Sequence, residues 1–114
     1  MAPFRYALSA LAEQDLAAIA RYTLEIWGPP QVQKYRALLN HALTDLTEDP
    51  LRHRTKARPE LFPECRSYHV GRHVVLYRIK GDTVEIARFL HDSMELERHL
   101  ILFPPPREWR QDQE

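Results

Sequence analysis

The sequence is poor in residues on which several classes of protein depend. Its one cysteine, Cys65, cannot form an intramolecular disulfide, which excludes a small disulfide-stapled domain and fits a reducing compartment. No apolar run approaches the roughly 20 residues of a membrane-spanning helix, and the first residues show no signal-peptide pattern. We therefore expect a cytoplasmic chain whose cysteine is inert, with a reactive thiol as the alternative.

Motifs for cofactors and metals are missing as well. The three glycines form no glycine-rich phosphate loop, and no serine-nucleophile elbow occurs. The six histidines are scattered, and none has metal-ligand spacing relative to another histidine, the cysteine or an acid. We expect neither a cofactor nor a metal site.

The formal net charge of the whole chain is zero, but single segments carry a net charge. Residues 51–91 carry nine arginines and lysines against four acids, whereas residues 92–114 carry three arginines against six acids. A local positive field attracts an acidic partner even in a neutral protein, although an ordinary solvated surface is the alternative interpretation. The 114 residues suffice for one core and therefore one domain.

The first half of the chain has the pattern of one strand and two helices. Phe4–Leu8 alternates apolar and polar residues, and Ser9 is placed to cap a helix that ends at Gly28. Pro30 opens a second helix that stops at Glu48–Pro50, so the two form an antiparallel helical hairpin. Three aromatic side chains are expected in its core: Tyr22, Trp27 and Tyr35.

The second half predicts an antiparallel sheet. Residues 51–65 have no periodicity and form a basic loop. Three strands then make a meander: Arg66–Val70, Arg72–Lys80 and Thr83–His91. A short helix follows at about Ser93–Leu100, which gives an α+β domain over residues 1–103 and a proline-rich polar tail over residues 104–114.

The turn between the last two strands fixes the expected register. With Gly81-Asp82 as a two-residue turn, alternation divides the pairs between two faces. The face expected under the helices holds Ile79/Val84, Tyr77/Ile86, Val75/Arg88 and His73/Leu90. The other holds an ion pair, Arg78/Glu85, then Leu76/Ala87, Val74/Phe89 and Arg72/His91.

The second face has an apolar middle between charged ends. Burying its four apolar side chains against a partner contributes about 4–8 kcal/mol before the costs of association. We interpret it as a partner-binding groove. The alternative is that the C-terminal helix or the basic loop of the same chain covers it.

Three segments carry a resemblance to a known family: LSALAEQDLAAIARYTLEIWG, ECRSYHVGRHVVLYRI and VEIARFLHDSMELERHL. In this order, from about Phe4 to Leu100, the chain resembles the ParE branch of the RelE/ParE toxin superfamily. The resemblance implies an α+β toxin of a type II toxin–antitoxin pair that poisons DNA gyrase. It also implies a ParD-like antitoxin whose C-terminal segment lies along the helical hairpin and over the sheet, and whose own DNA-binding part supplies the only, indirect, DNA contact.

The sister branch, RelE-like, consists of ribosome-dependent mRNA nucleases. In that branch an arginine stands three residues before a strand tyrosine; here the tyrosine is Tyr77 and the position is Val74, which cannot stabilise charge at phosphate. We expect a binding inhibitor rather than an enzyme, with a nuclease using His91, Arg72 and Arg88 as the alternative. The residues expected to bind the antitoxin are Arg52, Arg54, Lys56, Arg58, Arg72, Val74, Leu76, Arg78, Phe89 and His91.

Overall fold

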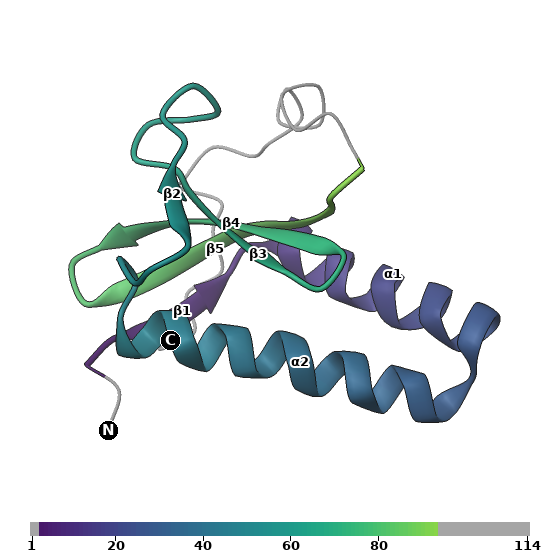
Figure 1. The fold of residues 1–114 in the computed structure, drawn as a ribbon. Helices are drawn as coiled ribbons and strands as arrows, with labels where there is room; N and C mark the ends of the chain where they lie inside the picture. The colour runs from purple at the N-terminus through teal and green to yellow at the C-terminus, as the bar shows by residue number, and fades with distance from the viewer. Residues whose placement is uncertain (1–2, 94–114) are drawn as a thin grey trace.

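The computed structural model describes residues 3–93 and places a helical hairpin on one face of a five-stranded sheet (Figure 1). The elements are β1 (Arg5–Leu8), α1 (Ala10–Trp27), α2 (Pro29–Glu48), β2 (Thr55–Ala57), β3 (Arg66–Val70), β4 (His73–Lys80) and β5 (Thr83–His91). The expected α+β class and the order of strand, helical hairpin and meander are confirmed. The expected C-terminal helix, apart from its first residue, and the tail over residues 104–114 lie outside the described residues.

The sheet has two more strands than the predicted meander. Its order is β1-β5-β4-β3-β2, with β1 parallel to β5 and all other neighbours antiparallel. The basic loop was expected to lack secondary structure, but three of its residues form β2 at the edge beside β3. No helix within residues 3–93 is both long and apolar enough to cross a membrane.

The helical hairpin begins and ends at the residues that the sequence indicates. The Ser9 hydroxyl oxygen accepts a hydrogen bond from the Ala12 N–H at 2.9 Å, which caps α1. Gly28 ends the helix with a φ of 87°, and its N–H donates to the Leu24 carbonyl. The second helix begins at Pro29, one residue before the expected Pro30.

The register between β4 and β5 is as expected only near the turn. Lys80 faces Thr83 and Arg78 faces Glu85. The ladder then shifts by one residue at Leu76/Tyr77. Such a β-bulge leaves Ala87 without a partner across the strand and moves every later pair by one position.

Because of the bulge, the last residues of β5 lie on other faces of the sheet than expected. His91 lies opposite His73 and not opposite Arg72, and Phe89 lies opposite Val75. Phe89 is therefore on the helix-covered face, where it joins the main core. Leu90, which was expected on that face, lies on the opposite face of the sheet. The prediction failed because side-chain alternation continues only through an uninterrupted ladder.

The start of α1 holds the backbone of the bulge. The Ser9 hydroxyl donates to the Ala87 carbonyl at 2.6 Å. One Asp15 carboxylate oxygen accepts from the Phe89 N–H at 2.9 Å, and the carboxylate also accepts from both Nε and Nη2 of Arg88, at 2.8 and 3.0 Å. Arg88 is thus paired with an acid of α1.

Asp15→Ala is expected to lower the free energy of unfolding by about 3 kcal/mol, because it leaves the largely buried Arg88 guanidinium without its partner. Urea denaturation measures this change. The control is Asp82→Ala, which breaks an exposed pair with Arg5 and is expected to lower the free energy of unfolding much less. Equal costs for the two variants would contradict the role assigned to Asp15.

Candidate functional site

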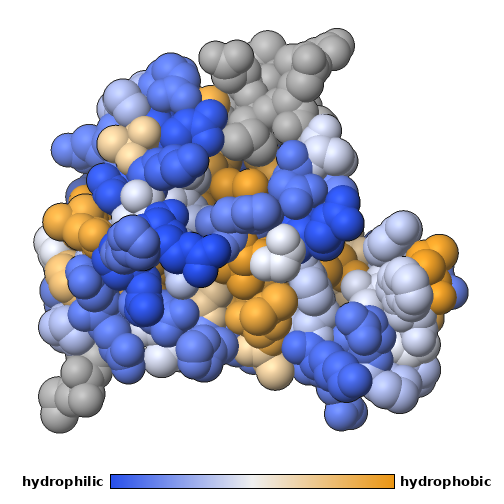
Figure 2. All heavy atoms as spheres, in the orientation of Figure 1, coloured by the Kyte–Doolittle hydropathy of each residue, from blue (hydrophilic) through white to orange (hydrophobic). Residues whose placement is uncertain are grey.

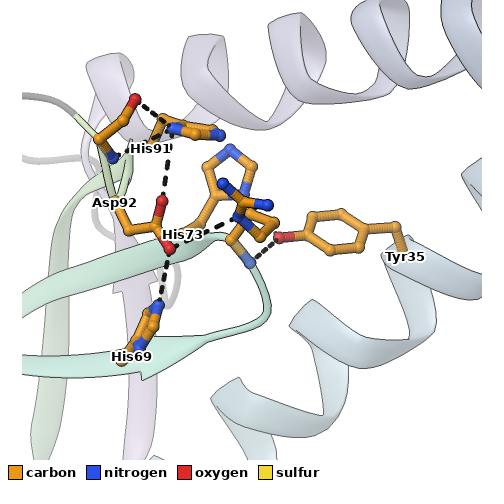
Figure 3. Close-up of polar contacts among 7 residues, drawn as sticks. Tyr35, His69, His73, His91 and Asp92 are labelled. Atoms are coloured by element: carbon orange, nitrogen blue, oxygen red, sulfur yellow. Dashed lines mark hydrogen bonds and ion pairs between the residues drawn. The ribbon is translucent and has the colours of Figure 1, made fainter.

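Polar and ionisable side chains meet where the β3–β4 turn approaches the end of β5 and the middle of α2 (Figure 3). The histidine cluster, as we name it, consists of Tyr35, His69, Arg72, His73, His91 and Asp92. The shifted register brings His91 to His73, and their rings lie edge to face with centroids 5.3 Å apart. Sequence reasoning selected Arg72 and His91 but missed the other four residues.

Tyr35 connects α2 to the turn. Its phenol oxygen accepts from the Arg72 backbone N–H at 2.9 Å and shares a hydrogen bond with His73 Nδ1, 2.6 Å away. Burial raises the pKa of Tyr35. Burial, followed by the charge of His91, lowers the pKa of His73. His73 is therefore neutral near pH 7.

Gly71 allows Tyr35 to come this close. Its φ is +59°, and a Cβ built there would lie 2.8 Å from the Tyr35 hydroxyl oxygen and 2.9 Å from a ring carbon. A glycine followed by a strand is common at turns, so the sequence alone gave no sign that a tyrosine 36 positions away depends on it.

Asp92 holds the exposed side of the cluster. It accepts from His69 Nε2 at 3.1 Å and forms an ion pair with Arg72 at 3.6 Å, and its other carboxylate oxygen lies 3.5 Å from His91 Nδ1. Although burial works against it, the hydrogen bond from His69 and the charge of Arg72 lower the pKa of Asp92. The His91 Nδ1 accepts from the Ser93 N–H at 3.1 Å.

The cluster can bind an anion and exchange protons with it. The Arg72 side chain is 72% exposed and the His91 side chain 37%, so both are accessible from solvent. Within residues 3–93, no group of three or more histidines, cysteines and acids is arranged to hold a metal ion.

The apolar face expected as a partner-binding groove is covered by the chain itself. Cys65, Leu76, Ala87 and Leu90 form a second buried cluster, and Leu61 and Phe62 of the basic loop pack against it. The groove interpretation is wrong, and the alternative, that the loop folds over this face, is correct. Leu76 and Phe89 are buried in the two clusters, so neither offers an exposed surface, whereas Val74 is half-buried.

The cations expected at the antitoxin surface fall into two groups. Arg52, Arg58 and Arg78 pair with Asp45, Glu60 and Glu85, at 3.4, 2.7 and 2.6 Å. The Arg54 and Lys56 side chains are exposed and form no hydrogen bond or ion pair with the residues that the structure describes. We name the exposed cations Arg54, Lys56 and Arg72 the basic rim. Burial raises the pKa of the Cys65 thiol to about 12, which agrees with the inert cysteine expected.

The end of the helical hairpin exposes apolar side chains, including two aromatic ones that were expected in the core. Trp27 is 69% exposed and Tyr22 63%, and Leu24 and Ile26 of the same helix are exposed as well. Figure 2 shows hydrophobic surface at this end of the hairpin, on the right. The expectation of core positions was wrong for these two aromatics, because the hairpin extends beyond the sheet (Figure 1). Nearer the sheet, a hollow of about 280 Å³ lies between the helices and is lined in part by Leu16, Val32 and Tyr35.

A family model and relatives of known name match most of this chain. The family model described as "ParE toxin of type II toxin-antitoxin system, parDE" matches residues 6–96. Toxin ParE1 of Mycobacterium tuberculosis is 34% identical over 84% of this chain and 97% of its own length. Toxin ParE of Escherichia coli is 36% identical over 80% and 87%. A solved structure titled "Chromosomal ParDE TA system from P. aeruginosa" has the same fold, with a TM-score of 0.67, 20% identity and coverage of 78% of this chain and 96% of that one.

Gly71→Ala is expected to destabilise the protein more than Gly81→Ala, as measured by thermal or urea unfolding. Both glycines have a φ near +60°, so both variants incur about 1 kcal/mol of left-handed strain. Only the Cβ at position 71 meets Tyr35; at position 81 no atom lies within 4 Å. An equal loss in both variants would mean that the contact between Tyr35 and the turn does not constrain the structure.

Proposed function

The chain belongs to the ParE toxin family of type II toxin–antitoxin systems, and we propose on that premise that it inhibits DNA gyrase by binding and is neutralised by a ParD-like antitoxin. The family resemblance supports gyrase as the target, since ParE-like toxins poison this enzyme. The relatives are toxins named ParE, which supports the same mode of action.

The observation that carries a binding mechanism is the environment of Val74. This position, three residues before Tyr77, holds an arginine in the nuclease branch. Here it holds a half-buried valine packed against the second cluster, which includes Leu76 and Leu90. An aliphatic side chain neither donates to phosphate nor stabilises the charge that develops there during cleavage. Binding without chemistry requires no such group.

The surfaces left for an antitoxin are the basic rim and the helical hairpin. The rim cations attract acids of an antitoxin segment, and exposed arginines and aromatics are the residues enriched in interfaces. Trp27 and Tyr22 give the hairpin an aromatic surface of this kind. The covered face of the sheet is not part of this proposal.

The purified protein is expected to inhibit supercoiling by DNA gyrase and to leave ribosome-bound transcripts intact, because it binds its target and cuts no RNA. Supercoiling and transcript cleavage are assayed on the same preparation. As a control, the purified antitoxin encoded next to the gene should restore supercoiling. Cut transcripts with normal supercoiling would reverse the proposal.

A ribonuclease remains a second candidate, because the structure pairs His91 with His73 beside the Arg72 guanidinium. Two imidazoles at this separation can act as general base and general acid on a phosphodiester, with an arginine to bind the phosphate. Arg88, which the nuclease alternative also included, is less suitable for binding phosphate, because its Nε and Nη2 both donate to the Asp15 carboxylate.

His91→Gln separates the two candidates. For a gyrase inhibitor, growth inhibition on expression without the antitoxin should not change, because glutamine leaves the fold and the basic rim in place. The matched control is His41→Gln, an exposed histidine on α2 outside the cluster. Toxicity lost in the His91 variant alone, with normal folding by circular dichroism, would establish the nuclease.

A further inference from the structure

The strand β2 has a neighbour on one side only. It ends the order β1-β5-β4-β3-β2 and lies left of the β3 label in Figure 1, and its second side has no neighbouring strand among the described residues. Lys56 and Ala57 are exposed there. An edge strand presents backbone N–H and C=O groups that another extended chain can pair with.

One hydrogen bond determines which backbone groups point outward. The Arg58 N–H donates to the Cys65 carbonyl at 2.7 Å, in the register that pairs Lys56 with Ser67. Hydrogen-bonded and non-hydrogen-bonded pairs alternate along an antiparallel ladder. The pair of Lys56 and Ser67 is therefore hydrogen-bonded, and Ala57 directs its N–H and C=O away from β3.

Ala57 is the central binding residue of this edge. The Thr55 N–H donates to the Arg52 carbonyl at 3.1 Å and is not available. The outward row thus consists of the Thr55 C=O and both backbone groups of Ala57. Within the described part of the chain, no side chain or turn forms a hydrogen bond with the two groups of Ala57.

The charge around the edge selects an acidic occupant. Arg54 and Lys56 are exposed and, among residues 3–93, have no acid partner, whereas Arg52 and Arg58 have one each. A second copy of this chain pairing at the same edge would set these cations against each other, and like charges across a ladder are destabilising. An acidic segment gains from the same cations.

A hollow of about 280 Å³ beside the edge can receive a side chain of the added strand. Its lining residues are Ala57, Pro59, Glu64, Cys65, Arg66 and Ile79. The Arg66 Nε atom is buried and has no hydrogen-bond acceptor in the described part of the chain. Because side chains alternate along a strand, every second residue of the occupant points to this side.

We propose that the outward edge of β2 binds an extended acidic segment of a partner polypeptide as a sixth strand of the sheet. The partner is the antitoxin, and to that extent the inference rests on the proposed function. Backbone hydrogen bonds at Ala57 give the affinity, and the cations Arg54 and Lys56 select the acidic sequence.

Ala57→Pro tests the backbone contact. Proline removes the outward N–H, leaves the β2–β3 hydrogen bonds and fits an edge strand. Ala57→Val, the matched control, changes the side chain and keeps the N–H. By calorimetry with the purified antitoxin encoded next to the gene, Ala57→Pro should bind about tenfold more weakly and Ala57→Val like the parent.

Hydrogen exchange on the parent complex gives a readout that requires no variant to fold. The Ala57 amide should exchange freely in the isolated toxin and become protected in the complex. Parent-like binding of both variants with an unprotected Ala57 amide would overturn strand addition and leave antitoxin binding intact. A parent chain that does not bind the antitoxin would overturn the proposed function too. Dimerisation that protects Ala57 would assign the edge to a second copy and overturn the acidic occupant.

Discussion

The extra residue in β5 takes backbone N–H and C=O groups out of the ladder between β4 and β5. These groups need other hydrogen-bond partners, and side chains at the start of α1 provide them. Ser9 binds the Ala87 carbonyl, and Asp15 binds the Phe89 N–H together with the Arg88 guanidinium. A bulge in a buried strand without such contacts would leave polar groups unsatisfied, at about 1–3 kcal/mol each. Helix and bulge therefore stabilise one another.

Both faces of the sheet depend on that arrangement. With the register shifted, Phe89 enters the main core under the helices and Leu90 joins the cluster that the basic loop covers. The same shift places His91 against His73, which Tyr35 holds from α2. The histidine cluster thus exists because α1 fixes an irregularity several residues earlier in β5.

Features determined by neighbouring residues could be predicted from the sequence. The cap at Ser9, the helix end at Gly28 and the pair of Arg78 with Glu85 across the Gly81-Asp82 turn are all local. The bulge could not, because residues about 75 positions away stabilise it. The exposure of Trp27 could not be predicted either. A periodic run of apolar residues shows which side chains share one face of a helix, but not how far the sheet opposite that face extends. The same limit applies to the candidate site: the sequence indicated Arg72 and His91 but not the residues that hold them.

The covered sheet restricts how a partner can act on this protein. Within residues 3–93, the helical hairpin covers one face of the sheet and the basic loop packs on the other, so a partner contacts surfaces outside these faces, among them the end of the hairpin and the β2 edge (Figure 1). They lie at opposite sides of a molecule whose longest extent is 38 Å. At roughly 3.3 Å per residue, about a dozen extended residues span that length. One short antitoxin segment could therefore contact both surfaces, and a partner that reached only one would leave the other open to a target.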